Sequence, residues 1–550
     1  MEHLVQNSAN YVPLSPISFL QRASIVYGER VSIVYGSLNY TWKQTYERCC
    51  KLASALNRMN VSNGHIVAAL GPNIPELYEL HFAIPMTGAI ISPLNICQDS
   101  SELAVQLKLL EPKLLFVDYG YLKLAVDALE ILTKTCTGFE FPEVVLMLET
   151  NPEAKMDADN DDLLRSGYRT YQSLIDDAEN DSGFEIVRPK SEFDAYSIVF
   201  TSGTTGEPKG VVHSHRGTYL TTLAEIILNE MKAMPVFLWT VPMYHCNGWC
   251  FTWAIAALGG TNICLRKYDA KFIFDAIIKY NVTNLGGATP VLSMIANSNH
   301  KPLPFKVNII TGGTPPQAHV VYKIEELGFI LTHSYGMSEM LGPGTVYPWR
   351  PEYGTLPLQE QAIFKALHGL NHMLMEAVDV KDPETMESVP FDGLTIGEVM
   401  FRGNTVTKGY YKNPERTRAA FEGGWYHTGD MAVRHPDGNI EVKDRKPDLI
   451  VSGDKQISTM DVEGVLFSHP AVFEAGVVGK PDEELGQTVC AFVRLKEECK
   501  ATGADEIIDY CRGKLPEYMV PKMVVFENLP FTSTGKLKKT ALREMAKSLA

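Results

Sequence analysis

Residues 200–210 read FTSGTTGEPKG, and this stretch decides how the rest of the chain is interpreted. It follows an apolar run, Tyr196–Phe200, and precedes the strand-like Val211–Val212. Glycine lets backbone N–H groups approach a polyphosphate, hydroxyl groups donate further hydrogen bonds, and a lysine adds positive charge. The GxxxxGKS/T pattern of a Walker loop is absent, so the stretch predicts a phosphate-binding loop of another kind. Its candidate ligands are Thr201, Ser202, Gly203, Thr204, Thr205, Gly206 and Lys209.

Short apolar runs alternate with longer helix-like stretches on both sides of this loop. Ile66–Leu70 has the pattern of a buried strand and Pro75–Met86 that of the following helix, while Asn308–Ile310 leads directly into Gly312–Gly313. Continuous apolar strands between helices are typical of sheets covered on both faces. We therefore predict a large α/β N-terminal domain, residues 1–445.

The pattern changes near Lys446, after which the predicted elements are shorter. Strands are expected at 473–478, 489–495 and 523–526, and helices at 506–514 and from 540 onward. These elements predict a separate α+β domain, residues 446–550, of ordinary domain size. Because no long linker separates the two domains, we expect the small domain to be a mobile lid that turns about a hinge at residues 444–447.

Charge and composition narrow the class of partner. The chain has 550 residues and a formal net charge of −15, so it lacks the overall attraction that non-specific nucleic-acid binding requires. No run approaches 18 apolar residues, so no membrane span is expected. The sequence predicts a small-molecule partner and leaves the oligomeric state open.

The termini and cysteines predict where the protein resides. The N-terminus lacks a basic region followed by an apolar one, and the cysteines form neither CxxC pairs nor a zinc pattern. The last residues, 547–550, do not form a Ser-Lys-Leu peroxisomal signal. We expect the protein in the cytoplasm, with the peroxisome as the alternative.

Four further regions carry side chains suited to a nucleotide. They are 312–316 (GGTPP), 335–339 (YGMSE), 425–430 (WYHTGD) with 444–445 (DR), and 530–536 (PFTSTGK). With residues 200–210 they resemble, in order from about residue 15 to 545, the adenylate-forming, AMP-binding superfamily of acyl-CoA synthetases, luciferases and peptide-synthetase adenylation domains. The resemblance implies ATP-dependent activation of a carboxylic acid as an acyl-adenylate.

The resemblance also implies a role for each region. Mg²⁺ prefers hard oxygen ligands, which suits Glu339. A carboxylate can accept hydrogen bonds from both ribose hydroxyls, which suits Asp430 with Arg445 beside it. A lysine that bridges the attacking carboxylate and the α-phosphate relieves their repulsion, which suits Lys536. Tyr335 is expected to stack on adenine. The other expected nucleotide contacts are Gly313, Thr314, Pro315, Ser334, Gly336, Met337 and Ser338, and Gly453 is expected beside coenzyme A.

Residues 242–249 (PMYHCNGW) indicate the branch of the superfamily. They resemble the plant acyl-activating enzymes related to acetate, butyrate, benzoate and cinnamate CoA ligases. This predicts an AMP-forming acid–thiol ligase of fatty acid or phenylpropanoid metabolism that uses ATP, Mg²⁺ and coenzyme A. Its acid would be a short- to medium-chain or aromatic monocarboxylate. His245 is the expected gate to the acyl pocket, and the expected pocket residues are Asn247, Trp249, Gly286, Gly287, Ala288 and Gly336.

Three positions depart from the family's usual residues. Pro447 occupies the hinge, Asp454 replaces the second glycine of a Gly-Gly pair, and Met340 follows Glu339 where threonine is common. Proline fixes its own φ and lacks an N–H donor. Two alternatives therefore stay open: an adenylating enzyme with another acyl acceptor, such as a carrier protein, and a non-catalytic nucleotide-binding relative.

Overall fold

The loop at residues 200–210 is carried by a β-hairpin. In the computed structural model, β8 (Ala195–Phe200) pairs antiparallel with β9 (Gly210–Ser214). The structure describes residues 6–151, 153, 167–178, 184–201, 208–313, 315–531 and 537–549. The two strands include the predicted runs Tyr196–Phe200 and Val211–Val212, which are rich in β-branched and aromatic residues.

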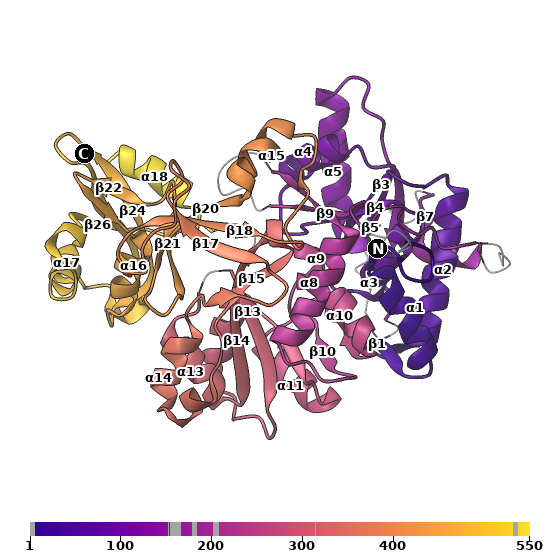
Figure 1. The fold of residues 1–550 in the computed structure, drawn as a ribbon, viewed down its shortest axis with the longest axis horizontal. Helices are drawn as coiled ribbons and strands as arrows, with labels where there is room; N and C mark the ends of the chain where they lie inside the picture. Colours follow the sequence, from indigo (N-terminus) through magenta and orange to yellow (C-terminus); the bar gives the residue numbers. More distant parts are fainter. Residues whose placement is uncertain are drawn as a thin grey trace. The chain divides into compact units, whose positions relative to one another are not determined.

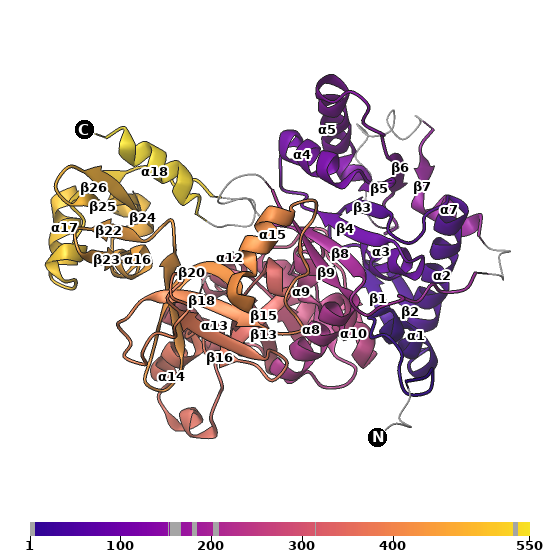
Figure 2. The same cartoon turned by 45° about the horizontal axis from the view of Figure 1, so that its top comes forward.

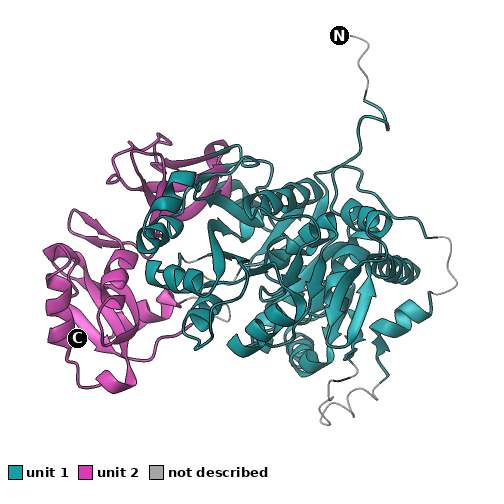
Figure 3. Ribbon diagram, turned by 90° about the horizontal axis from the view of Figure 1, so that it is seen from below, with its two compact units in different colours: residues 1–201, 208–377, 402–419 teal, residues 202–207, 378–401, 420–550 magenta. Residues whose placement is uncertain are grey.

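The described residues form two units (Figure 3). Unit 1 is formed by the described parts of residues 1–201, 208–377 and 402–419, and unit 2 by those of residues 378–401 and 420–550. The boundary that we predict at residues 445 and 446 lies inside unit 2 and stays a prediction.

The hairpin belongs to the first sheet of unit 1. In order across the sheet, its strands are β19 (Gly409–Tyr410), β9, β8, β4 (Ile90–Leu94), β3 (Ile66–Leu70), β5 (Leu114–Asp118), β6 (Glu143–Met147) and β7 (Arg169–Thr170). Strands β4, β3, β5 and β6 run parallel.

Helices cover both faces of this sheet (Figure 2). Ala68 of β3 packs with α4 (Ser100–Leu110) and α5 (Leu122–Thr135), while Val67 packs with α2 (Trp42–Arg58) and α3 (Pro75–Met86). All twelve residues of α3 are buried, including the polar Glu76, Glu79 and His81, and Glu79 forms an ion pair with Arg48 of α2. The predicted covered α/β sheet is confirmed.

A second sheet in unit 1 carries two of the other segments predicted to bind a nucleotide, 312–316 and 335–339. In order, its strands are β16 (Leu370–Asn371), β15 (Gly342–Val346), β14 (Phe329–Met337), β13 (Val307–Gly312), β12 (Asn284–Gly286), β10 (Val236–Leu238), β11 (Thr261–Ile263), β1 (Val31–Tyr35) and β2 (Leu38–Thr41). Strands β13 and β14 run side by side and parallel (Figure 1). Ile309 of β13 packs with α11 (Ala270–Tyr280), α12 (Thr289–Ala296) and α13 (Ala318–Glu326), while Ile310 faces the opposite core.

Unit 2 has the predicted α+β character. Its larger sheet has the order β17 (Ala377–Lys381), β18 (Gly397–Arg402), β20 (Tyr426–Arg434) and β21 (Ile440–Arg445). The remaining strands are β22 (Ile450–Ser452) with β23 (Lys455–Ile457), and β24 (Val472–Asp482) with β25 (Gly486–Leu495) and β26 (Met523–Phe526). Val477 of β24 packs with α16 (Thr459–Phe467) and α17 (Ala504–Arg512), whereas Val478 packs with α18 (Lys539–Lys547). Successive side chains of β24 point to opposite faces of the sheet and therefore pack into two different hydrophobic cores.

Helix length bears on the expected lack of a membrane span. Helix α2, one of the longer helices, has 17 residues and a charged face, whereas a span needs about 20 apolar residues. Within the described parts of the chain, no helix combines the length and apolar character needed to cross a membrane.

Candidate active site

The ends of the predicted phosphate loop are held together by the β8–β9 hairpin. The N–H of Thr201 donates to the carbonyl oxygen of Lys209 at 3.2 Å. A Cβ atom at Gly210 would lie 3.0 Å from a methyl group of Ile198 and 3.3 Å from Cβ of Tyr411, so glycine fits the close packing here. The predicted ligands Ser202, Gly203, Thr204, Thr205 and Gly206 lie outside the described residues.

The adenine-contact segments meet at the carboxyl ends of β13 and β14. Gly312 and Ser334 are directly paired across these parallel strands, and the Ser334 hydroxyl donates to the carbonyl oxygen of Thr311 at 3.3 Å. Gly313 follows with φ of 91°, a conformation that glycine adopts easily. Tyr335 comes next after Ser334 and is only 5% exposed. In open α/β sheets, ligands bind beyond the carboxyl ends of neighbouring parallel strands.

Pro315 follows this edge, and Thr314 lies outside the described residues. Of the expected adenine contacts, the structure brings Gly313, Ser334 and Tyr335 to one edge of the second sheet. Their contact with a nucleotide stays a prediction.

Gly336 lies at an irregularity in the pairing of β14 with β15. The register shifts between Tyr335 and Gly336. A Cβ atom at Gly336 would lie 2.0 Å from the carbonyl oxygen of Gly342, far inside van der Waals contact. Close approach of the two backbones therefore explains this glycine on structural grounds. Its predicted role as the wall of the acyl pocket remains a prediction.

The candidate metal ligand Glu339 is buried and oriented by a tyrosine. Glu339 is 9% exposed and lies in the short 3₁₀ turn Ser338–Met340. The Tyr410 hydroxyl donates to Oε1 of Glu339 at 2.9 Å, and the Thr407 N–H donates to its carbonyl oxygen at 2.7 Å. A neutral donor orients the carboxylate without cancelling its charge, so Glu339 fits a Mg²⁺ ligand.

Tyr410 was not predicted from the sequence. It lies 71 residues from Glu339, in a short strand with no sequence pattern that pairs the two. Within the described residues, no group of three or more His, Cys, Asp or Glu side chains could hold a metal ion.

The segment after His245 has an unusual backbone. Five successive residues, 246–250, have φ between 42° and 62°, and only Gly248 among them is a glycine. For each of the four residues that are not glycine, a left-handed conformation costs about 1–2 kcal/mol. Such strain is retained where the surroundings impose it, commonly at functional sites.

Asn73, at the turn between β3 and α3, holds the chain that leads into this segment. Its amide donates to the carbonyl oxygens of Trp239 and Val241 at 3.0 Å each, and its Oδ1 accepts the N–H of Met243 at 2.8 Å. Asn73 was also missed in the sequence analysis. The available signal was a polar residue just beyond the carboxyl end of a buried strand.

The acyl-pocket candidates on this segment lie against β13 and the Glu339 turn. The Cys246 Sγ lies 3.4 Å from the Ser338 hydroxyl, and a Cβ atom at Gly312 would lie 3.9 Å from the Trp249 indole. The Asn247 side chain is fully buried, and its amide atoms have no hydrogen-bond partner among the described residues. His245, Asn247 and Trp249 thus belong to one segment, which lies beside β13 and the turn that carries Glu339.

The glycines on the neighbouring strand are close-packed. A Cβ atom at Gly286 would lie 2.5 Å from Val241, and one at Gly287 would lie 2.8 Å from Val291. Tight packing explains both glycines, and Ala288 follows as the residue before α12. Whether they line the acyl pocket stays a prediction.

In unit 2, the predicted ribose pair is formed across two strands. Asp430 of β20 and Arg445 of β21 are directly paired, and Arg445 Nε lies 3.3 Å from Asp430 Oδ1. Gly429 has φ of 74°, and its N–H donates to the carboxylate of Glu398 at 2.8 Å. Glu398, which was not predicted, also lies 3.3 Å from Nδ1 of His427. The site therefore offers a carboxylate and a guanidinium on two paired strands, and a second carboxylate, that of Glu398, accepts the N–H of the neighbouring Gly429.

The predicted hinge forms a tight turn directly after Arg445. The carbonyl oxygen of Arg445 accepts the N–H groups of Asp448 at 2.8 Å and Leu449 at 3.0 Å, with Pro447 between them. The predicted coenzyme A contact Gly453 has φ of 61° and lies in the β22–β23 turn. Lys536 lies outside the described residues.

Comparison with known proteins gives consistent matches over the whole chain. Residues 20–411 match the model of AMP-binding enzymes, and residues 461–536 match that of the AMP-binding enzyme C-terminal domain. A probable acyl-activating enzyme of Arabidopsis thaliana is 48% identical, covering 100% of this chain and 98% of that protein. A 2-methylpropanoate–CoA ligase and an acetate–CoA ligase of Humulus lupulus are 44% and 43% identical, covering 100% of this chain and 98% and 97% of those proteins.

Solved structures show the same fold. An ATP-bound MatB protein of Rhodopseudomonas palustris has a TM-score of 0.80 at 23% identity, covering 97% of this chain and 99% of that one. An o-succinylbenzoate CoA synthetase of Bacillus subtilis, in complex with ATP and magnesium, has a TM-score of 0.78 at 23% identity, covering 96% and 99%.

Proposed function

This chain belongs to the AMP-binding enzyme family, and from that premise we propose that it converts a short- to medium-chain or aromatic monocarboxylic acid into its CoA thioester through an acyl-adenylate. The enzyme is an AMP-forming acid–thiol ligase. Relatives named as 2-methylpropanoate, acetate and butyrate CoA ligases are 43–44% identical over the whole chain.

One observation carries the proposal. Gly313, Ser334 and Tyr335 lie together at the carboxyl ends of two parallel strands, and the buried Glu339 carboxylate follows four residues after Tyr335. This edge suits a flat base on the backbone and a metal-bound triphosphate beyond it. Glu339 would hold Mg²⁺, which neutralises charge on the phosphates, and Lys209 and the hydroxyl-rich loop would bind the phosphates themselves.

The first step brings two anions together, the carboxylate of the acid and the α-phosphate. We therefore propose that the enzyme catalyses it mainly by electrostatic stabilisation. The acid's carboxylate oxygen attacks the α-phosphorus, the bond to pyrophosphate breaks, and the acyl-adenylate remains bound. Lys536 would bridge the carboxylate and the α-phosphate during this step. Asp430 and Arg445 would hold the ribose, and the CoA thiol would then displace AMP.

The acid would be bound by the segment 245–249 and the packed glycines 286 and 287. His245 would separate the nucleotide side from the acyl side. The apolar character of Trp249 and the close-packed backbone favour a compact acyl group without a second charge. The names of relatives that act on acetate, butyrate and 2-methylpropanoate are consistent with this range.

A panel of acids tests the proposal. Pyrophosphate release is measured with acetate, butyrate, 2-methylpropanoate, benzoate and cinnamate, each with and without coenzyme A. We expect at least one acid to give release that increases when coenzyme A is added, with AMP and the acyl-CoA as products. Release that is unaffected by coenzyme A would favour another acyl acceptor. No release with any acid would favour the non-catalytic alternative.

Lys536→Ala separates the two half-reactions. We expect a loss of pyrophosphate release on the order of 100-fold or more with little change in ATP binding, because the lysine acts mainly in the adenylation transition state. A supplied acyl-adenylate should still react with coenzyme A. An equal loss in both half-reactions would make Lys536 a structural residue.

A further inference from the structure

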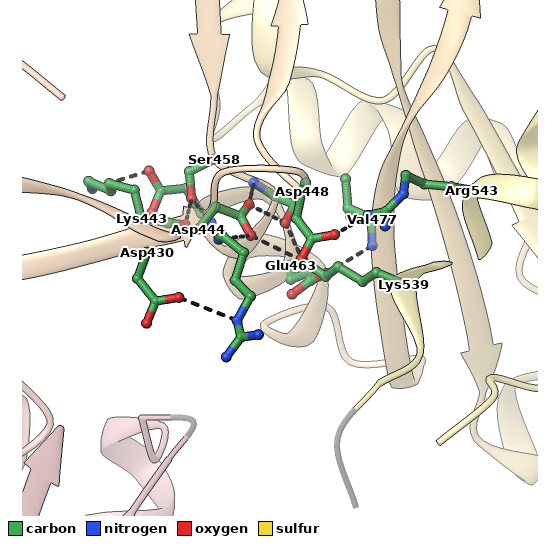
Figure 4. A network of polar contacts seen from close by, with 12 residues as sticks. Asp430, Lys443, Asp444, Asp448, Ser458, Glu463, Val477, Lys539 and Arg543 are labelled. Carbon is green, nitrogen blue, oxygen red and sulfur yellow. Dashed lines mark hydrogen bonds and ion pairs between the residues drawn. The ribbon is translucent and has the colours of Figure 1, made fainter. Parts of the chain in front are cut away.

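A buried ion network in unit 2 is centred on Lys539 (Figure 4). The Lys539 side chain is 14% exposed, and its Nζ lies 3.0 Å from Oε1 of Glu463 and 3.7 Å from Oδ1 of Asp444. It also donates to the Thr459 hydroxyl. Burial by itself would lower the pKa of Lys539, but the carboxylates of Glu463 and Asp444 raise it above its usual value, so the ammonium group stays charged.

Two other contacts fix the acidic partners. Glu463 Oε1 accepts the N–H of Val477 at 2.9 Å, which ties α16 to β24. Asp444 Oδ2 accepts the N–H of Thr459 at 2.7 Å and also the Thr459 hydroxyl. The network therefore joins three elements, β21, α16 and α18, through buried charged hydrogen bonds, which are stronger than neutral ones.

On one side, the network leads to the proposed ribose pair. The N–H of Arg445 donates to Oδ1 of Asp444 at 3.1 Å, and Arg445 in turn contacts Asp430. A displacement of Asp444 would therefore move the backbone of Arg445.

On the other side, Lys539 begins the helix that follows the segment of Lys536. Phe531 and Leu537 form an antiparallel bridge, and the N–H of Lys538 donates to the carbonyl oxygen of Pro530 at 2.8 Å. Residues 530–531 and 537–538 thus close the base of the segment, and Lys539 is the next residue.

We propose that Lys539 is a positioning residue for adenylation: it fastens the base of the Lys536 segment to β21, the strand that carries Arg445. This inference rests on the proposed function, in which Lys536 acts on the α-phosphate of a nucleotide whose ribose contacts Arg445. The physical reason is geometric, because a displacement of about 1 Å at a reacting group can lower a rate on the order of 100-fold.

The network also spans the predicted hinge. Asp444 precedes Lys446 and Pro447 in the chain, while Thr459, Glu463 and Lys539 follow them. A rotation at Lys446 and Pro447 would separate Asp444 from Thr459 and Lys539. The proposal assigns the arrangement with these contacts to adenylation, so the contacts of Lys539 with Asp444 should support adenylation and be dispensable for thioester formation.

Single-turnover measurements on Lys539→Met test the proposal. Butyrate is the first probe of adenylation and synthetic butyryl-adenylate the probe of thioester formation, and the measurements are then repeated with the acid of the panel that reacts fastest. We expect pyrophosphate release to slow on the order of 100-fold. The KM for ATP and the reaction of the supplied adenylate with coenzyme A should change by less than about threefold. Lys539→Arg should restore most of the rate, since a guanidinium group can contact both carboxylates.

Arg543→Met is the matched control. Arg543 is on the same helix and forms an ion pair with Asp448, which also follows Pro447 in the chain. Its removal likewise leaves a carboxylate unpaired but keeps the contacts of Lys539 with Asp444 and Thr459. We expect a similar fall in melting temperature and nearly wild-type adenylation. Equal effects of Lys539→Met and Arg543→Met on adenylation, or an equal loss in both half-reactions of Lys539→Met, would overturn the proposal.

Lys539→Met leaves two buried carboxylates without their cation, which lowers stability, so the double variant Lys539→Met/Glu463→Gln provides a second measurement. It removes one of the uncompensated charges. A folded double variant that adenylates at the wild-type rate would also overturn the proposal. If the wild-type protein releases no pyrophosphate with any acid, the proposed function itself fails. If the wild-type protein and Lys539→Met are equally active, only the positioning role is refuted.

Discussion

At the scale of single residues, Gly336 is required by its neighbour across the sheet. The carbonyl oxygen of Gly342 occupies the position that a Cβ atom at Gly336 would approach to 2.0 Å. The atom in the way is backbone, which cannot rotate aside as a flexible side chain can. Any side chain at this position therefore forces β14 and β15 apart.

We expect Gly336→Ala to lower the free energy of unfolding by about 1–3 kcal/mol or more, because overpacking displaces the backbone. Gly354→Ala is the control, since a Cβ atom there has no neighbour within 4 Å. Chemical denaturation of both variants measures the difference, and equal stability of the two would contradict the argument. The acetate-to-benzoate ratio of kcat/KM in Gly336→Ala tests the pocket role separately, because the folded fraction cancels in that ratio.

Tyr410 and Glu339 make a second residue-scale contact with a measurable consequence. We expect Tyr410→Phe to raise the Mg²⁺ concentration for half-maximal activity about tenfold, because an oriented carboxylate ligand loses its hydrogen-bond donor. Titration of Mg²⁺ against pyrophosphate release measures this. Tyr411→Phe removes a hydroxyl from the adjacent position and should leave the Mg²⁺ requirement unchanged. The same shift in both variants would contradict a role of Tyr410 in orienting the metal ligand Glu339.

At the scale of elements, helix α8 (His215–Leu228) presents a buried polar face to β15. A Cβ atom at Gly342 of β15 would lie 2.8 Å from Thr221 and 3.2 Å from Oε1 of Glu225. The Asn229 amide donates to Oε2 of Glu225 at 2.9 Å. Burial raises the pKa of Glu225 to about 8, with the Asn229 hydrogen bond opposing the shift, so this carboxyl group is mostly protonated at neutral pH.

This gives a pH dependence with a defined sign. The pKa of Glu225 is higher in the folded chain than the value of about 4.3 in an unfolded one, so its stabilising effect is complete below pH 4.3 and is lost as the pH rises through 8. We expect Glu225→Gln to be more stable, relative to wild type, at pH 9 than at pH 5.5 by about 1–3 kcal/mol. Urea denaturation at both pH values measures the change. Glu230→Gln, at an exposed position, should show no such difference, and a parallel pH profile for Glu225→Gln and wild type would refute the assignment.

At the scale of the whole molecule, the predicted hinge at Lys446 and Pro447 lies in a hydrogen-bonded turn within unit 2. The carbonyl oxygen of Arg445 is bonded to the N–H groups of Asp448 and Leu449. The missing N–H of Pro447 is therefore not needed by these bonds. Proline constrains its own φ and its predecessor, but leaves ψ of Pro447 and φ of Asp448 free.

We accordingly expect Pro447→Lys to change thioester formation by no more than a few-fold, roughly one to threefold, and to leave adenylation unchanged. Single-turnover rates of the two half-reactions measure both effects. An acceleration of the second half-reaction by about tenfold or more would mean that proline locks the adenylation orientation, and the chain would then be specialised for adenylate formation.

Local pattern was sufficient for much of the fold and for the order of the site segments. The predicted strand at Ile66–Leu70, the helix at Pro75–Met86 and the strand at Met523–Phe526 coincide with β3, α3 and β26. The two strands are continuous apolar runs with clear ends, and the helix begins at a proline and is rich in apolar residues, all of which are properties of neighbouring residues in the chain. The candidates for the nucleotide site, such as Gly313, came from the same kind of local signal, a glycine directly after a buried strand, and their role stays a prediction.

The sequence by itself therefore determined the family, the covered α/β sheets and the candidates for each chemical role. Only the tertiary structure decided which residues support them: Asn73 beneath the His245 segment, 170 residues from Met243, Tyr410 on Glu339, Gly342 against Gly336, and Lys539 on Asp444. The physical reason is that these contacts depend on which distant backbones approach within hydrogen-bond or van der Waals distance. Helical and strand periodicity reports the environment of a residue along its own element and carries no record of its partner on another.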